Sequence, residues 1–268
     1  RIVQQALVQV LSPIFEPTFS EYSYGFRPGR SCQNAIDRAL ECLNSGYEWI
    51  VDLDLEKFFD NVNHDKLIRL VDNQVKDSDV TSLIMKFLKA GVMVNGTFEE
   101  SKVGTPQGGN LSPLLSNIML NQLDKELERR GHRFVRYADD SIIFCKSKRA
   151  AQRVSESITD FIEKKLYLKV NREKTEVGSI IGMKYLGYSF RIMRGECRLT
   201  VHSKTYGKLR KKLKEATKRS NGMGYQSRKD KMHQIIRGWI TYFQLADMQN
   251  RLKEIDEWLR RRYRMCIW

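Results

Sequence analysis

The stretch RFVRYADDSIIF, from Arg133 to Phe144, sets two neighbouring aspartates between two apolar runs. Both runs are rich in the β-branched and aromatic residues that favour strands, and the short polar centre favours a tight turn. We therefore predict a β-hairpin with Asp139 and Asp140 at its turn. Carboxylates are costly to bury and two adjacent ones repel each other, so this pair needs solvent or a cation as its partner.

A second apolar stretch also ends in a carboxylate. In EWIVDLDLEKFF, from Glu48 to Phe59, residues alternate with the period of a strand, which puts Asp52 and Asp54 on one face and Asp54 at the strand's end. Carboxylates that converge from two strands need cations between them, and Mg²⁺ accepts oxygen ligands while keeping positions open for phosphate. Two such ions about 4 Å apart stabilise the attacking and leaving oxygens in phosphoryl transfer. A lone aspartate pair in a turn is usually only a solvated turn, and it is the second strand that favours a metal site.

The distribution of charge indicates a polyanionic partner. The chain has 268 residues and a formal net charge of +15, of which residues 201–268 carry +12 with 18 basic and 6 acidic side chains. A nearly neutral body followed by a strongly basic segment is typical of nucleic-acid binding, and the alternative is a solvated lysine-rich helix face. No stretch stays apolar for the roughly 18 residues of a membrane span, so we expect no membrane association. The five cysteines lack zinc-site spacing, and reduced thiols in a cytoplasmic protein are the simplest interpretation.

The rest of the chain alternates helical and strand-like patterns. Residues 1–44 are helical around a loop, a second helical region runs to about Lys89, and MVNGTFEE predicts a hairpin with Asn95-Gly96 as its turn. Ser112 and Pro113 are of the types that cap and open a helix. Short strand patterns follow at LKVN, KYLGYSF and CRLTV, before a helical segment whose apolar stripe is Met232, Ile235, Ile236, Trp239, Ile240 and Phe243. This order predicts an α+β fold with an all-α appendage.

Six ordered motifs resemble those of reverse transcriptases. YADD resembles their signature hairpin, DLEKFFDNVNH their first metal-binding motif, and GTPQGGNLSPLLSNIML their loop and helix beneath the nascent base pair. SYGFRPGRS resembles the block before these, LKVNREKT the segment after the hairpin, and KYLGYSF the primer-gripping strand. The motifs GFRPGRS, YADD and, in the C-terminal part of the chain, IRGWITYF are similar to those of group II intron-encoded reverse transcriptases and maturases. The resemblance covers essentially the whole chain.

The resemblance implies a right-hand polymerase, with a palm of antiparallel sheet and helices. Residues 1–50 would be partial fingers, 51–200 the palm with inserted finger elements at about 70–105, and 201–268 a basic helical thumb or maturase-specific region. The implied activity is RNA-directed DNA synthesis, in which two Mg²⁺ ions assist transfer from a deoxynucleotide to a primer 3′-OH on an RNA template. The protein would also bind intron RNA as a splicing maturase, and a homodimer is left open.

Two other functions are weighed against this one. The alternative is an RNA-binding maturase fragment with little or no polymerase activity, although retained aspartates favour catalysis because clustered negative charge would hinder a pure RNA binder. A bacterial reverse transcriptase of the retron or diversity-generating kind is disfavoured by the maturase-like end of the chain. In the family, basic finger residues that clamp the triphosphate precede the point that resembles Arg1, so we expect an incomplete clamp.

The family's functional residues carry over to matching positions. Asp54, Asp139 and Asp140 would be the catalytic, metal-binding carboxylates, while Asp52 is expected to be only a strand-edge residue. Phe59 would exclude a ribose 2′-OH, Gln107 would lie near the incoming nucleotide, and Lys174 would give a proton to the leaving pyrophosphate or be a surface lysine. Arg27 and Arg30 would either reach template phosphates or pin their own loop. The primer grip would be Tyr185, Leu186 and Gly187, and further RNA-binding residues would be Arg260, Arg261, Arg262 and Arg264.

Overall fold

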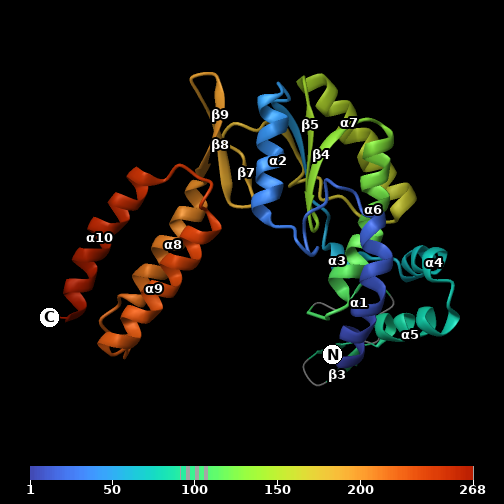
Figure 1. Ribbon diagram of the computed structural model, residues 1–268, viewed down its shortest axis with the longest axis horizontal. Helices are drawn as coiled ribbons and strands as arrows, with labels where there is room; N and C mark the ends of the chain where they lie inside the picture. Colours follow the sequence, from blue (N-terminus) through green and yellow to red (C-terminus); the bar gives the residue numbers. More distant parts are fainter. Residues whose placement is uncertain (91, 95–96, 100–102, 106–107, 268) are drawn as a thin grey trace. The chain divides into compact units, whose positions relative to one another are not determined.

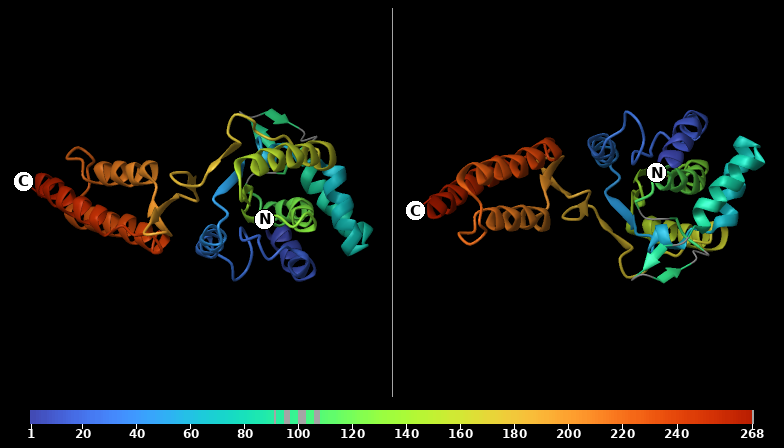
Figure 2. Two further views of the ribbon diagram at one scale, coloured as in Figure 1. Left: turned by 90° about the horizontal axis from the view of Figure 1, so that it is seen from above. Right: turned by 90° about the horizontal axis from the view of Figure 1, so that it is seen from below.

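The chain forms two compact units, Arg1–Gly178 (unit 1) and Ser179–Trp268 (unit 2). The structure, a computed structural model, describes residues 1–90, 92–94, 97–99, 103–105 and 108–267. Figures 1 and 2 show the course of the chain through both units. In the described part of the chain, no helix is both long and apolar enough to span a membrane.

Unit 1 is built on a four-stranded sheet in the order β4-β5-β1-β6. Its strands are β1 (Trp49–Leu53), β4 (Arg133–Tyr137), β5 (Asp140–Cys145) and β6 (Glu176–Ser179). The predicted hairpin and the predicted strand before Asp54 thus pair directly, with Leu53 opposite Ser141. Because β1 lies between β5 and β6, Asp52 belongs to an interior strand and not to a strand edge as expected.

Helices cover the sheet and make up the rest of unit 1. They are α1 (Ile2–Phe15), α2 (Cys32–Asn44), α3 (Phe58–Asn61), α4 (His64–Val75), α5 (Ser78–Lys89), α6 (Ser112–Arg129), α7 (Lys148–Phe161), a 3-10 turn (Glu16–Thr18) and a π-helical turn (Ile162–Leu166). α2 packs on β4 while α7 packs on β1 and β5. Consecutive residues from Ser141 to Cys145 are buried, so both faces of β5 are covered.

Two predicted boundaries differ in detail. The helical region up to Lys89 is two helices, because Lys76 takes a left-handed conformation (φ 50°) and the Asp77 side chain caps α5. Ser112 is the first residue of α6 rather than its cap, which is Leu111 without a capping side chain. β2 (Val92–Val94) and β3 (Thr97–Glu99) pair as expected, and their predicted turn at Asn95-Gly96 lies outside the described residues.

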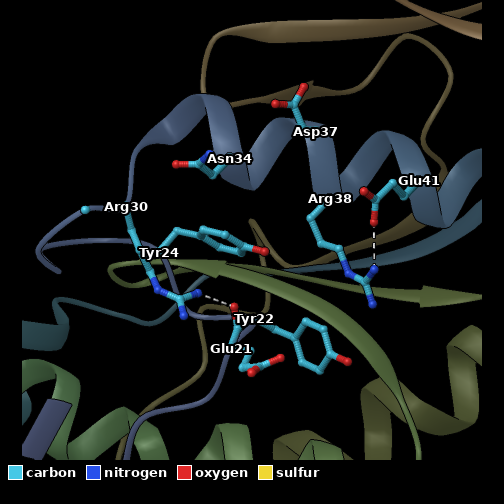
Figure 3. Close-up of a pocket in the computed structure, with 9 residues that line it drawn as sticks. Glu21, Tyr22, Tyr24, Arg30, Asn34, Asp37, Arg38 and Glu41 are labelled. Atoms are coloured by element: carbon cyan, nitrogen blue, oxygen red, sulfur yellow. Dashed lines mark hydrogen bonds and ion pairs between the residues drawn. The ribbon is translucent and has the colours of Figure 1, made fainter. Parts of the chain in front are cut away.

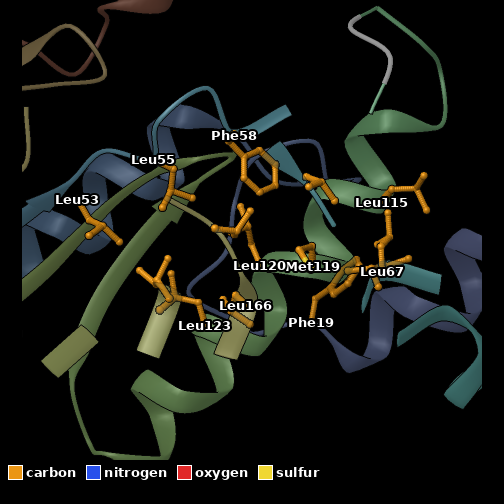
Figure 4. Close-up of a cluster of buried hydrophobic side chains, with 14 of the residues drawn as sticks. Phe19, Leu53, Leu55, Phe58, Leu67, Leu115, Met119, Leu120, Leu123 and Leu166 are labelled. Atoms are coloured by element: carbon orange, nitrogen blue, oxygen red, sulfur yellow. The ribbon is translucent and has the colours of Figure 1, made fainter. Parts of the chain in front are cut away.

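The core of unit 1 surrounds α6. Leu115, Met119, Leu120 and Leu123 of this helix are buried against residues from β1, α4 and the segment after α7 (Figure 4). Burial on α6 is not limited to apolar residues and includes Ser116, Asn117, Asn121 and Asp124. A helix that is covered almost all round is a central element, and the polar residues on it must find partners inside the protein.

Unit 2 combines a small sheet with three helices. The sheet has the order β7-β8-β9, with β7 (Lys184–Tyr185), β8 (Tyr188–Met193) and β9 (Glu196–Val201). α8 (Ser203–Ala216) packs against both α9 (Tyr225–Tyr242) and α10 (Gln249–Ile267) (Figure 2). Met232 and Phe243 of the predicted apolar stripe are buried, whereas Ile240 is 38% exposed.

The division between the units comes after Gly178, whereas the sequence predicted a palm that continues to residue 200. The sheet of unit 2 joins its helices through side chains: the Tyr188 ring lies 5.0 Å from that of Phe243, and its hydroxyl donates to Tyr242 O at 2.6 Å. These contacts assign β7–β9 to the same compact unit as α8–α10. The names fingers, palm and thumb for the three predicted segments stay predictions.

Candidate active site

A cavity of about 750 Å³ in unit 1 is lined by two of the predicted catalytic carboxylates. Asp54 directly follows β1, and Asp139 lies in the turn between β4 and β5. Phe58, Phe59 and residues 170–174 complete much of the lining. The fold therefore brings together an aspartate and a hairpin turn that are far apart in the sequence.

The hairpin turn has two central residues, Ala138 and Asp139, since Tyr137 pairs with Asp140. Ala138 has a positive φ of 59°, a conformation that is unfavourable for a residue with a Cβ atom. Two-residue loops are the commonest connections of β-hairpins, and the second residue of this loop, Asp139, lines the cavity. Asp139 owes its place in the cavity to this turn.

Asp140 and Asp52 lie at the same end of the sheet. Leu53 and Ser141 are the last pair of the register between β1 and β5, and Asp54 and Asp140 are the residues that adjoin this pair. Burial raises the pKa of the Asp52 carboxyl to about 7. The charge of Asp140 adds to this rise in pKa, followed by those of Glu176 and Asp54. The sequence did not predict that Asp52 would be an interior carboxylate close to other acidic residues. The alternation that puts Asp52 and Asp54 on one face of the strand could have indicated it.

The segment after α7 holds Asp54 and carries Lys174 to it. The backbone N–H of Asn171 donates to Asp54 O at 2.9 Å, and the N–H of Asp54 donates to the Thr175 hydroxyl at 3.3 Å. Lys174 Nζ lies 4.0 Å from Asp54 Oδ1 in an ion pair that is largely exposed on the lysine side. Sequence reasoning singled out Lys174 but not Asn171 or Thr175, which fix the strand end. Their signal was the motif LKVNREKT itself.

Phe59 is held by the ring of its neighbour and by backbone hydrogen bonds from the glycine-rich motif. Its ring packs edge-on against buried Phe58 at 5.2 Å between centroids. Its carbonyl accepts from the N–H of Thr105 at 2.6 Å, and Gly104 N–H donates to Val62 O at 2.8 Å. The half-buried ring is thus fixed in the lining of the cavity by a segment from the glycine-rich motif. Gln107, predicted in the same motif, lies outside the described residues.

Two predicted RNA-binding arginines have structural roles. Arg27 is buried, pairs with Glu16 at 2.8 Å and donates to Ser23 O at 2.8 Å, so it pins its own loop and does not present its guanidinium to a template. Arg262 donates to the Thr217 hydroxyl at 2.8 Å and to Thr217 O at 3.1 Å, which ties α10 to the end of α8. Arg27 thus has a carboxylate partner within the chain, while neutral oxygens of Thr217 accept the hydrogen bonds of Arg262.

The other predicted arginines lie at the surface. Arg260 pairs with Asp256 on the same helix and is 70% exposed, and Arg261 and Arg264 are also exposed. Arg30 donates to Glu21 O and lines a separate cavity of about 610 Å³ with Tyr24 and residues of α2 (Figure 3). Its guanidinium lies 5.5 Å from the Tyr24 ring centroid.

The predicted primer-grip strand is a hairpin and not one continuous strand. Leu186 (φ 47°) and Gly187 (φ 88°) form the turn between β7 and β8, where two successive positive φ values are those of a type I′ turn. Tyr185 is buried. The Leu186 carbonyl accepts from the Tyr242 hydroxyl at 3.1 Å, so α9 holds this turn within unit 2.

Two carboxylates facing one open cavity suit the predicted metal. Among the residues that the structure describes, no group of three or more His, Cys, Asp or Glu side chains is arranged to hold a metal ion. Mg²⁺, however, commonly uses only one or two protein carboxylates and completes its shell with water and substrate phosphates. Asp54 and Asp139 are hard oxygen donors that line a cavity with room for a nucleotide. The donor set therefore fits the ion.

Comparison with known proteins agrees with this arrangement. Residues 1–190 match the family described as Reverse transcriptase (RNA-dependent DNA polymerase), and residues 207–268 match Group II intron, maturase-specific domain. The chain is 33% identical over 259 residues to Group II intron-encoded protein LtrA of Lactococcus lactis, with 72% of this chain covered, and 31% identical over 249 residues to protein YkfC of Escherichia coli, with 78% covered. Apo telomerase from Candida tropicalis shares the fold, with a TM-score of 0.56 at 14% identity over 97% of this chain and 53% of that one.

The shared fold, with helices around an antiparallel sheet, confirms the predicted α+β fold class. The chain belongs to the reverse transcriptase family, in its group II intron-encoded branch, as the sequence motifs predicted. It spans 43% of the length of LtrA and 63% of that of YkfC.

Proposed function

We propose that this chain catalyses RNA-templated DNA synthesis, in which the 3′-OH of a primer attacks the α-phosphate of a deoxynucleotide. The observation that carries the proposal is the cavity in which Asp54, Asp139, Phe59 and Lys174 meet. Acid, aromatic and basic side chains in one hollow match the three parts of a nucleotide that must be recognised: its metal-bound phosphates, its sugar and its leaving group. Family membership supports the same reaction.

Each side chain would contribute separately to this reaction. Asp54 and Asp139 would hold Mg²⁺, and Asp140 would complete the set; bound ions supply charge stabilisation to the attacking and leaving oxygens. Phe59, fixed by Phe58 and by the hydrogen bond from Thr105, would pack where a 2′-OH would otherwise lie. Lys174 would leave its weak, exposed ion pair with Asp54 for the phosphates of the bound nucleotide.

Unit 2 would hold RNA. α8 contains Lys204, Lys208, Arg210, Lys211, Lys212 and Lys214, all exposed, against a single acid, Glu215. Such density of positive charge on one short helix favours contact with phosphates. The match to the maturase-specific domain supports intron RNA as the partner, alongside an RNA template and a DNA primer. The cytoplasmic location and the homodimer remain predictions.

A second candidate is an RNA-binding maturase without polymerase activity, and the concentration of charge in unit 2 favours it equally. Primer extension on an RNA template, with deoxynucleotides and Mg²⁺, separates the two. Asp54→Asn and Asp139→Asn should each abolish extension yet leave RNA affinity intact, while Asp65→Asn, at an exposed position in the first turn of α4, should change neither. RNA binding by the parent chain without any extension would exclude the polymerase and leave the maturase.

A further inference from the structure

Arg136 of β4 forms a buried ion pair directly behind the hairpin turn. Its side chain and that of Asp124 are both 0% exposed. Arg136 Nε donates to Asp124 Oδ1 at 2.8 Å, and Nη2 donates to Oδ2 at 2.5 Å. A buried ion pair of this kind stabilises a fold little compared with apolar residues of equal size, because both charges lose their hydration. Its position therefore calls for another explanation.

The remaining donors of the guanidinium reach the turn that carries Asp139. Arg136 Nη1 donates to Ala138 O at 2.8 Å and to Asn117 Oδ1 at 3.0 Å. Ala138 is the strained residue with φ 59°, and its carbonyl belongs to the peptide that leads into Asp139. One rigid, planar group thus joins α6 to the peptide bond next to a predicted metal ligand.

Gly25 closes the opposite side of the same turn. Asn117 Nδ2 donates to Gly25 O at 2.9 Å, which links this glycine to the Arg136 group. A Cβ atom at Gly25 would lie 2.1 Å from Ala138 N, so no larger residue fits unless the turn moves. Backbone hydrogen bonds from Tyr24 N–H to Arg136 O and from Arg136 N–H to Tyr22 O hold the two segments together.

We propose that Arg136 is a positioning residue for nucleotidyl transfer. Its guanidinium holds the Ala138-Asp139 peptide in the position that puts the Asp139 carboxylate in the cavity. Asp124 and Asn117 orient the guanidinium, and Gly25, which has no Cβ atom, lets the loop before α2 pack directly against the turn. The inference rests on the proposed function. It adds a buried support, contributed by α6 and the loop before α2, to the residues that line the cavity.

The main test replaces Arg136 by lysine. Lysine keeps the charge opposite Asp124 but cannot reproduce the planar fork that reaches Ala138 O. Arg136→Lys should lower kcat for primer extension about 100-fold, the effect of displacing a reacting group by about 1 Å. KM for the deoxynucleotide should change little, because Phe59 and Lys174 are untouched. Arg129→Lys is the matched control, since Arg129 also forms a two-pronged pair, with Glu126, but is 70% exposed.

Metal binding gives a readout that is independent of activity. The probe is Mn²⁺, counted as the free ion by electron paramagnetic resonance in the presence of parent or variant. Arg136→Lys should weaken Mn²⁺ binding about tenfold, as expected when a support of a ligand is lost, and Asp139→Asn should weaken it at least as much. A merely structural ion pair would lower the melting temperature of Arg136→Lys but leave kcat and Mn²⁺ affinity of the folded protein at parental values.

Gly25→Ala tests the inference if Arg136→Lys fails to fold, because it removes no charge and acts only on the turn. It should show the same loss of kcat and of Mn²⁺ affinity. Parental values of both quantities in either folded variant would overturn the inference. Absence of extension by the parent chain would instead contradict the proposed function, and the Mn²⁺ comparison would still decide the role of Arg136.

Discussion

Replacing Arg260, Arg261 and Arg264 together by glutamine should weaken RNA binding without destabilising unit 2. Arg262→Gln alone should instead lower the stability of unit 2 and leave RNA binding close to that of the parent. All four were predicted to bind RNA, but the structure separates them. The first three are exposed, and Arg260 pairs with the exposed Asp256 one turn earlier on the same helix. Arg262 is half-buried and donates to Thr217 at the end of α8.

The expected magnitudes follow from these environments. Each phosphate contact contributes about 0.7–0.9 to the slope of log affinity against log salt, so the triple variant should lose about 2 units of slope. When salt is raised from about 50 to 200 mM, the affinity of the parent should therefore fall by a factor roughly ten times larger than the factor for the triple variant. Arg262→Gln loses hydrogen bonds from a charged donor to Thr217, worth about 1–3 kcal/mol, which lowers the melting midpoint by several degrees.

Fluorescence anisotropy of a labelled RNA across a salt series measures the slope, and circular dichroism measures the melting. The assignments are refuted by a triple variant whose slope equals that of the parent. They are equally refuted by an Arg262→Gln protein that melts like the parent and loses slope like its neighbours. Arg129→Gln, on exposed α6 surface in unit 1, controls for the general loss of positive charge.

Three further predictions concern unit 1. Phe59→Ala should raise incorporation of ribonucleotides relative to deoxynucleotides by about tenfold or more in primer extension, and an unchanged ratio would move the gate to another side chain. Gly104→Ala should destabilise unit 1 by about 1–3 kcal/mol in urea unfolding, because φ is +95° and the new Cβ would lie 2.8 Å from Phe59 O; Gly131→Ala, with φ +70° and nothing within 4 Å, should cost less. Hydrogen bonding to Arg129 holds the pKa of Glu126 at about 2, below its usual 4.5, so its contribution to stability is present above pH 4.5 and lost as the pH falls towards 2. The fall in melting temperature over that range should be smaller in Glu126→Gln.

Alternation and turn residues in the sequence predicted those strands and turns that depend on neighbouring residues. The strand before Asp54 and the hairpin around Asp139 were found where alternation and turn residues indicated them. KYLGYSF was misread as one strand, because its turn depends on distant contacts. The Tyr242 hydroxyl bonds to Leu186 O across 56 residues, and the Phe243 ring lies against Gly187.

The same distinction applies to the candidate site. The sequence motifs identified Asp54 and Asp139 as candidate metal ligands because the spacing of each to the other residues of its motif is fixed. They could not tell a surface arginine from a buried one: Glu16 makes Arg27 a structural residue, and Thr217 does so for Arg262. Those partners are recognised only after the chain has folded, since no periodic pattern links them to the arginines.

The order of strands in unit 1 has a consequence for how the protein is made. β1 ends at residue 53, yet both of its neighbours, β5 and β6, come from residues 140–145 and 176–179. At about 5–20 residues per second, ribosomes need roughly 5–20 s to produce the partner of a strand already synthesised. During that interval the apolar segment WIVDL has an unpaired edge on both sides and is open to association with other nascent chains. Slower translation between α3 and β4 would lengthen this exposure and lower the yield of folded protein.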